Sequence, residues 1–192
     1  MTSIELLSEV DSITRKNIDF IQKNLTKLSE NQLKWKPNSL SWNLLEIFAH
    51  LNEYARFYHA AFAYKIEITK FREPKSQFIS SPLGKSAWKS MKLGNLNNIK
   101  RKFNAHRSFN PSVQTELVNG SDIEIFQEKQ SELMELIEKA KSVNLQRVKV
   151  PIAISKLIRL RLGDALLFVV YHNERHIQQA FNIIEHRAFP KN

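Results

Sequence analysis

Three histidines have the residue type and the spacing of a metal site. His172 and His176 are four residues apart, so on a helix their side chains project from one face, about one turn apart. His50 lies in another apolar segment, between Phe48 and Leu51. Neutral imidazole is the commonest protein ligand for zinc, nickel and similar ions. Three imidazoles from two helices would leave one coordination position open, which is typical of a catalytic rather than a structural metal site.

The surroundings of the histidine pair favour burial. Residues 165–170 are all apolar, and apolar residues continue the helical spacing from Ile177 to Ile184. An unpaired imidazole in a buried helix is costly, which favours a metal ligand; a solvated or hydrogen-bonded histidine is the alternative. The other histidines lack such a context. His59, nine residues after His50, faces the opposite side of its helix, about 180° around. These other histidines are His59, His106 and His186.

The composition indicates a helical protein without thiol chemistry of its own. The chain has 192 residues, 42% hydrophobic and 25% charged, which predicts a single domain over residues 1–192 with a substantial core. Four glycines and six prolines are few, which favours helices over a turn-rich β fold. The absence of cysteine excludes disulfides, cysteine zinc sites and thiol nucleophiles, and is compatible with the cytoplasmic location that we expect. We find no signal-peptide pattern and no apolar run long enough to span a bilayer, so no membrane partner is expected.

Apolar periodicity predicts four long helices. Asn43 is a good N-cap for the second of them, and Glu46 three residues later completes a capping box. Residues 148–162 are rich in β-branched side chains and contain Pro151, which favours extended structure. The pattern predicts an all-α four-helix bundle with a long connection between the second and third helices, in which inward side chains converge on a metal site. The long helices are expected at residues 3–29, 42–70, 121–142 and 164–186, loops at 30–41, 71–88 and 104–120, and a weaker helical stretch at 91–103.

The net charge of +10 is concentrated in the middle of the chain. Residues 61–120 carry 11 basic and three acidic residues, a balance of +8, whereas the sequence before them is neutral and the sequence after them carries +2. Such a segment can meet nucleic acid, an anionic membrane surface or an acidic small molecule, or form a solvated basic surface. Nucleic acid is disfavoured because no nucleic-acid-binding motif accompanies the charge. We expect the segment to border the open side of the histidine site and to supply positive charge there, through Lys100, Arg101 and Lys102.

Two motifs occur in an order and spacing known from other proteins. The first reads Trp42-Asn43-Leu44-Leu45-Glu46 and is followed by His50-Leu51; the second reads His172-Asn173-Glu174-Arg175-His176-Ile177-Gln178-Gln179. Together with the earlier Gln32-Leu33-Lys34-Trp35-Lys36-Pro37, they resemble the DinB-like (DinB/YfiT) superfamily of proposed metal-dependent enzymes, over roughly residues 3–186. The superfamily has a serine where Asn43 stands here, and this substitution preserves N-capping. Each motif alone is weak, but all of them in this order make a specific pattern.

The resemblance implies an all-α four-helix bundle in up-down-down-up order, with His50, His172 and His176 as ligands of one divalent metal, zinc or nickel. Activities in the superfamily include thiol S-transferases that use bacillithiol or mycothiol, a maleylpyruvate isomerase and hydrolases. Accordingly, a metal-dependent enzyme acting on a small-molecule substrate is expected, with thiol transfer preferred over hydrolysis. Because the chain has no cysteine, the thiol must come from a cofactor such as bacillithiol. A non-enzymatic stress-response module with a basic surface is the alternative, and a homodimer is left open.

Four further residues are candidates for roles beside the metal. Glu46, one turn before the first histidine, could accept a proton or orient an imidazole, or serve only as the helix cap. Gln179 lies on the face of the histidine pair, about 20° from His172, and could bond a ligand or substrate, or make a buried structural hydrogen bond. Tyr54 is a pocket wall or simply core, and Arg175 is an ion-pair or anion contact rather than a catalyst. Glu174 is not a zincin-type base, because it points about 200° away from the first histidine of the pair.

Overall fold

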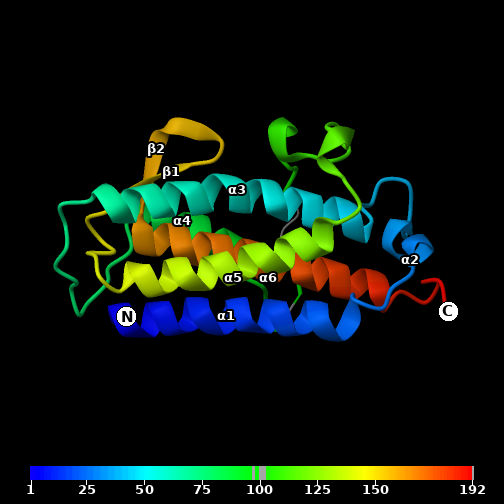
Figure 1. Cartoon of the computed structure of the whole chain (residues 1–192), viewed down its shortest axis with the longest axis horizontal. Coiled ribbons are helices and arrows are strands. Elements are labelled where there is room, and N and C mark those ends of the chain that lie inside the picture. Colours follow the sequence, from blue (N-terminus) through cyan, green and yellow to red (C-terminus); the bar gives the residue numbers. More distant parts are fainter. Residues whose placement is uncertain (97, 100–102, 192) are drawn as a thin grey trace.

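The computed structural model describes residues 1–96, 98–99 and 103–191. In this part of the chain the fold is mostly helical with one small two-stranded sheet, which broadly fits the all-α expectation (Figure 1). The α-helices are α1 (Ser3–Asn24), α2 (Glu30–Lys34), α3 (Leu44–Ile68), α4 (Pro82–Met91), α5 (Asp122–Ala140) and α6 (Leu162–Ile184). Two 3-10 helices, η1 (Arg107–Phe109) and η2 (Thr115–Leu117), and two strands, β1 (Lys149–Ile152) and β2 (Ser155–Arg161), complete the elements.

The first helix is shorter than its apolar spacing predicts. A capping box fixes its start: the Thr2 hydroxyl accepts from the Glu5 N–H at 3.0 Å, and Glu5 Oε2 accepts from the Thr2 N–H at 2.7 Å. The prediction that this helix extends to residue 29 is wrong, because a second capping box, between Ser29 and Gln32, starts the short α2. Local capping therefore divides a stretch that periodicity alone treats as one helix and a loop.

The helix that carries the first histidine begins where its capping motif predicts. Asn43 Oδ1 accepts from the Glu46 N–H at 2.8 Å, and Glu46 Oε2 accepts from the Asn43 N–H at 2.8 Å. α3 then runs to Ile68, close to the predicted end at residue 70. With its start fixed in this way, α3 places His50 in its second turn.

The long connection between α3 and α5 contains a helix at a different place from the predicted one. α4 covers Pro82–Met91, whereas the sequence predicts a loop up to residue 88 and a helix over 91–103. This prediction is wrong for the described residues 92–96, 98–99 and 103, which are not helical, and the rest of that range lies outside the described residues. The Ser81 hydroxyl accepts from the Gly84 N–H at 3.0 Å and so caps the first turn. Proline fits that turn because its missing N–H would have no partner inside the helix. The start signal at Ser81 thus outweighs the weak apolar spacing further along the chain.

A β-hairpin joins α5 to α6. β1 and β2 pair antiparallel, with Val150 opposite Leu160, and both side chains are buried. The extended structure predicted for residues 148–162 is therefore confirmed. α6 begins at Leu162, directly after β2 and close to the predicted start at residue 164.

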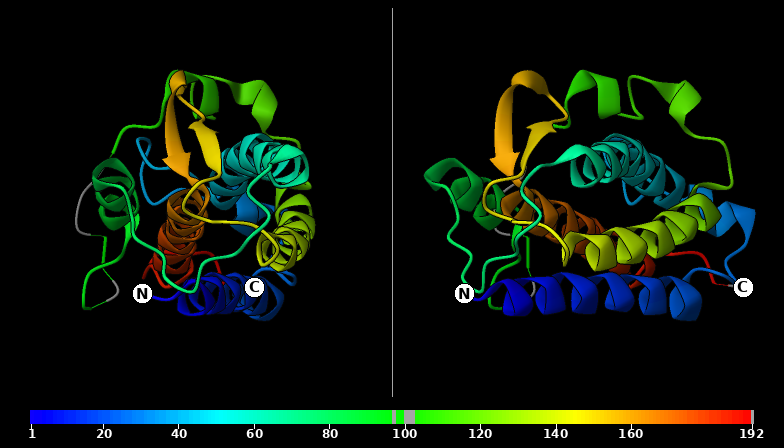
Figure 2. Two further views of the ribbon diagram at one scale, coloured as in Figure 1. Left: turned by 90° about the vertical axis from the view of Figure 1, so that its left-hand side faces the viewer. Right: turned by 60° about the vertical axis from the view of Figure 1, so that its left-hand side comes forward.

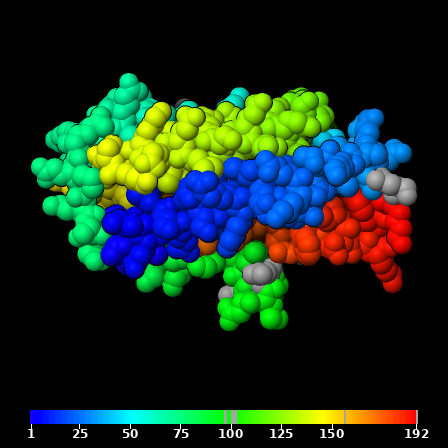
Figure 3. Space-filling view, turned by 60° about the horizontal axis from the view of Figure 1, so that its bottom comes forward, coloured from blue at the N-terminus to red at the C-terminus, as the bar shows by residue number. Residues whose placement is uncertain are grey.

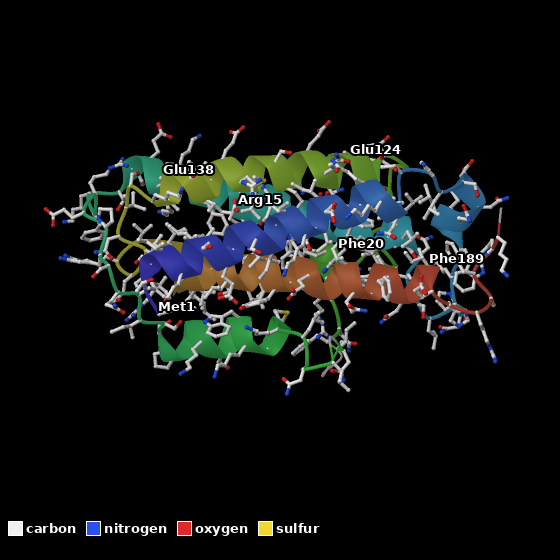
Figure 4. All side chains as sticks on the ribbon, turned by 90° about the horizontal axis from the view of Figure 1, so that it is seen from below. Met1, Arg15, Phe20, Glu124, Glu138 and Phe189 are labelled. Carbon is white, nitrogen blue, oxygen red and sulfur yellow. The ribbon has the colours of Figure 1, made fainter. Side chains whose placement is uncertain are left out.

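The four long helices pack side by side. α1 and α3 each contact both α5 and α6, and α1 lies along the seam between α5 and α6 (Figure 3). α1 and α6 run in one direction, whereas α3 and α5 run in the other (Figure 1). Phe20 lies on the side of α1 towards α6, where its ring centroid is 6.4 Å from that of Phe181 (Figure 4). Within the described residues, none of the helices has the length and apolar character needed to cross a membrane.

The interior consists of two apolar clusters with the histidine pair between them. One cluster extends along α6 as far as Tyr171, and the other resumes on the same helix at Ile177. His172 and His176 occupy the turn of α6 between these two residues. Because apolar packing holds α6 on both sides of that turn, the direction of the two imidazoles is fixed by the core.

Gly84→Ala is expected to destabilise the protein by forcing α4 away from α6. α4 lies along the first part of α6 (Figure 4), and a Cβ at position 84 would overlap the carboxylate of Asp164, which is fully buried. Overpacking of this kind costs about 1–3 kcal/mol of the free energy of unfolding. Urea denaturation measures the effect, with the exposed Ser86→Ala on the same helix as the control. Equal unfolding midpoints for the two variants would contradict the tight packing.

Candidate metal centre

The structure brings the three histidines of the sequence pattern together. α3 contributes His50, and α6 contributes His172 and His176, one turn apart. Their ligating nitrogen atoms all lie within 4.8 Å of one another, and their ring centroids are 4.7–5.2 Å apart. His50 and His172 are 2% and 6% exposed, so the cluster is shielded from bulk water. The arrangement is compatible with one metal ion held by three imidazoles.

The tautomer of His50 is fixed by a backbone carbonyl. Nδ1 of His50 lies 2.5 Å from the carbonyl oxygen of Phe109 in η1. A carbonyl can only accept, so Nδ1 carries the proton and Nε2 keeps its lone pair. This Nε2 lies 3.3 Å from Nε2 of His172. The lone pair of His50 therefore points into the cluster, as a metal ligand requires.

The second histidine of the α6 pair is oriented in the same manner. Nδ1 of His176 lies 3.0 Å from Oε1 of Gln179, one turn further along the helix. An Nδ1–H that donates to this amide oxygen leaves the other ring nitrogen, Nε2, unprotonated. The structure thus places the Gln179 side chain in a hydrogen bond to a histidine of the cluster. A contact of Gln179 with a substrate stays a prediction.

Gln179→Ala is expected to weaken metal binding without removing it. Loss of the group that orients His176 should lower the metal affinity 10- to 100-fold, as is typical for such partners. A competition titration of zinc with a chelator measures the affinity. Gln178→Ala is the matched control, because the Gln178 side chain bonds to Asn182 on the same helix instead. Equal affinities for the two variants would show that the bond to His176 is not needed.

The electrostatics of the cluster keep the imidazoles neutral. Burial lowers the pKa of His50 from 6.5 to about 4. Burial is also the largest cause that lowers the pKa of His172 and of His176 well below the ordinary value, and the neighbouring histidines and Arg175 lower both further. Neutral imidazoles at neutral pH are the form that binds a metal ion, so protons do not compete for the site there.

Aromatic side chains surround the cluster. The ring centroid of Tyr54 lies 4.5 Å from that of His172 and 4.9 Å from that of His50. Phe168 stacks on His172 at 5.9 Å, and Trp42 lies 4.9 Å from His50. Tyr54 therefore packs against two of the three histidines, and its role as a pocket wall stays a prediction. Rings on several sides limit the access of water and hold the imidazoles in place.

Glu46 is engaged at the start of α3. One carboxylate oxygen accepts from the N–H of Asn43 in the capping box, and the other lies 2.7 Å from Lys36 Nζ in an ion pair. The capping role considered for Glu46 is confirmed by this box. Its role as a proton acceptor or as a partner of an imidazole stays a prediction.

Arg175 brings a positive charge close to the histidines. Its side chain is buried beside the two α6 imidazoles, and its guanidinium lies over the ring of Phe103 at 5.3 Å. Burial lowers its pKa. One part of the basic middle segment, η1, reaches the histidines through the carbonyl of Phe109. Lys92 of the same segment instead donates to the hydroxyl of Tyr171, and its Nζ lies 3.5 Å from Oε1 of Glu9. Lys100, Arg101 and Lys102, which are predicted to supply charge to the site, lie outside the described residues.

Sequence reasoning missed several neighbours of the histidines. Phe168 precedes His172 by four residues, and this spacing was a signal that could have found it. Phe109 gave no signal, because it contributes a backbone carbonyl from a connection 59 residues away from its partner. The expectation that His59 lacks a buried setting is wrong: it is as buried as the first histidine, and its Nδ1 lies 3.3 Å from Glu132 on α5. It is not part of the histidine cluster, as its position on α3 predicts.

The comparisons with known proteins agree with the motifs. A family model of the DinB superfamily matches residues 14–180. Neither the curated proteins nor the solved structures gave a match. The matched range contains all three histidines and both motifs that surround them. Because the match covers most of the sequence, the chain belongs to the DinB superfamily.

Proposed function

We propose that His50, His172 and His176 hold one divalent metal ion, zinc or nickel, and that this ion is the reactive centre of an enzyme. The observation that carries the proposal is the convergence of three neutral imidazoles with ligating nitrogens within 4.8 Å of one another. The hydrogen bonds to Phe109 and Gln179 turn the Nδ1 protons away and leave Nε2 lone pairs for a cation. Within the described residues no fourth His, Asp or Glu joins the cluster, which favours a catalytic over a structural site.

For the reaction we propose thiol S-transfer to a small-molecule electrophile, with hydrolysis as the second candidate. A divalent ion bound to three imidazoles supplies a Lewis acid that lowers the pKa of a thiol or a water at the open position. The thiol would come from a low-molecular-weight cofactor such as bacillithiol, because the chain has no cysteine. The preference for thiol transfer rests on the resemblance to the thiol S-transferases of the superfamily.

The residues around the histidines have separate proposed roles. Gln179 orients His176, and Tyr54 excludes water from the cluster. Arg175 attracts an anionic substrate or thiolate to the site. Glu46 is the proposed proton acceptor, which Glu46→Gln tests because the amide keeps an oxygen for the cap but removes the base. Loss of turnover with normal metal content would support this role, and unchanged turnover would leave the residue as a cap only.

We propose further that the chain is one domain, residues 1–192, built as a four-helix bundle in up-down-down-up order. This order is supported by the helix directions, because α1 and α6 run in one direction and α3 and α5 run in the opposite direction (Figure 1). The contacts of α1 and α3 with both other long helices support a bundle. A family match that runs through all four helices supports a single domain.

Elemental analysis followed by turnover assays tests the proposed function. Metal-loaded protein would be screened with bacillithiol and an alkylating electrophile, and separately with amide and ester substrates. Consumption of the thiol with formation of its conjugate supports the transferase, whereas hydrolysis supports the second candidate. No turnover in either panel despite full metal occupancy would contradict the enzyme and favour a binding module. No metal after purification and reconstitution would contradict the metal site itself.

A further inference from the structure

Two stretches of the sequence without acidic residues come together in the fold. Residues 74–115 contain eight Lys and Arg, and residues 139–163 contain seven, with no Asp or Glu in either stretch. The first includes α4 and the second includes the β-hairpin. α4 contacts β2, and both lie beside the beginning of α6 (Figure 2). The excess charge that the sequence places in the middle segment is therefore joined by a second basic segment.

The outer face of the hairpin carries positive charges close together. Leu160 is buried, so by the two-residue repeat of a strand Leu157, Arg159 and Arg161 lie on the opposite face of β2. Lys149 stands directly across from Arg161 in the strand register, and burial together with Arg161 lowers its pKa. Like charges in opposite positions destabilise a sheet. None of these basic side chains forms a salt bridge with a residue that the structure describes, so an external anion would relieve the repulsion.

Aliphatic side chains protrude among these charges. Leu157 is 92% exposed, and Ile154, Ile79 and Leu83 are each more than half exposed. The Arg161 guanidinium donates to the carbonyl of Ile79, just before α4, so the hairpin and the segment that leads into α4 lie side by side. We name this surface the basic–aliphatic face; it consists of Ile79, Leu83, Lys85, Lys149, Leu157 and Arg159.

We propose that the basic–aliphatic face docks the protein on the surface of a bilayer rich in anionic lipid. Basic side chains near such a surface attract its headgroups, and protruding aliphatic side chains enter the boundary between headgroups and acyl chains. A nucleic acid would use the charges but not the aliphatic side chains, and a second copy of the chain would bring positive charge against positive charge. An anionic bilayer surface matches both features. The expectation of no membrane partner rested on the lack of a spanning segment, which docking at the surface does not need.

Vesicle flotation of the full chain tests the charges of this face. The probes are phosphatidylcholine vesicles with and without phosphatidylglycerol, and binding is expected only to the anionic vesicles and to weaken as salt rises. Each basic side chain near an anionic surface increases the partition coefficient onto the vesicles about fivefold. The triple variant Lys85→Gln, Lys149→Gln and Arg159→Gln should therefore weaken vesicle binding roughly 100-fold. The control changes the same number of charges on the exposed residues of α1, α2 and their link, Lys23→Gln, Lys27→Gln and Lys34→Gln.

A matched pair of leucines tests the aliphatic part. Leu157→Ser should weaken vesicle binding about tenfold or more, because the inserted side chain is lost. Leu40→Ser is the control, since Leu40 is 96% exposed but lies before α3, in the segment next to α2. Neither change touches the core, and circular dichroism would confirm that both proteins are folded. Metal content is expected to stay normal in both, which separates this proposal from the proposed function of the histidines.

Several results would overturn the proposal. The proposal fails if the protein does not bind anionic vesicles, or if the face variants bind them as well as the wild type does. It also fails if the control variants lose as much vesicle binding as the face variants. Salt-dependent binding of DNA or RNA without vesicle binding, if abolished by the charge variant, would assign the face to nucleic acid instead. A dimer that dissociates in Leu157→Ser, again without vesicle binding, would assign it to a second copy of the chain.

Discussion

The His172→Ala protein is expected to stay folded and to lose its metal. The apolar faces of the four long helices carry the stability of the fold, and alanine is a good helix former at this position. Removal of a ligand should lower the metal affinity by more than the roughly 100-fold that loss of an orienting group can cost. Elemental analysis after dialysis measures the metal, and a circular dichroism melt measures the fold. Turnover, where it is found for the wild type, should disappear together with the metal.

His59→Asn is the control for this experiment. His59 is also buried on α3, but its imidazole faces Glu132 on α5 and lies outside the cluster. This variant is expected to keep a normal metal content. Full metal occupancy in His172→Ala, or equal loss in the two variants, would show that the three clustered histidines are not the ligands.

Metal-free protein is expected to lose stability as the pH falls from about 6.5 to about 4. Burial lowers the pKa of His50 in the folded state from 6.5 to about 4. Between these values the unfolded chain binds more protons than the folded chain, so the free energy of unfolding falls as the pH falls. At 1.36 kcal/mol per pKa unit, His50 alone accounts for about 3 kcal/mol, all of it lost by about pH 4. His172 and His176 add to the effect, because burial also lowers their pKa values.

Urea denaturation of chelator-treated protein at a series of pH values measures this dependence. His50→Gln should give a shallower decline of the unfolding free energy with falling pH, because glutamine binds no proton. His106→Gln, which replaces an exposed histidine outside the cluster, should follow the wild type. A wild-type decline no steeper than that of His50→Gln would contradict the buried, neutral state of this imidazole.

Local signals predicted the helices that carry the site. The capping box of Asn43 and Glu46 set the start of α3, and the spacing of His172 and His176 placed them one turn apart on α6. Both features depend on residues within about one helical turn of each other, and such interactions can be read along the chain. The four-residue spacing also explains why the pair could be assigned to one face before any packing was known.

Local signals failed where several weak ones competed. The helix expected over residues 91–103 lies instead at Pro82–Met91, because the cap at Ser81 and the proline after it define a start more strongly than the apolar spacing does. α1 ends early for a similar reason, since the box at Ser29 begins a new helix. After the end of α1, Leu25 and Leu28 still pack against the core, so periodicity overestimated the length of that helix.

Composition and spacing indicated the kind of site, which is free of cysteine and based on histidines from two predicted helices. Only the tertiary structure decided that His50 reaches the α6 pair, and that the carbonyl of Phe109 fixes its tautomer. The same holds for the basic–aliphatic face, which joins α4 to a hairpin some 70 residues later in the chain. The physical reason is common to all three. Helix starts and faces follow from contacts within a turn, whereas a backbone carbonyl carries no side-chain signal, and elements distant in sequence meet only through packing of the core.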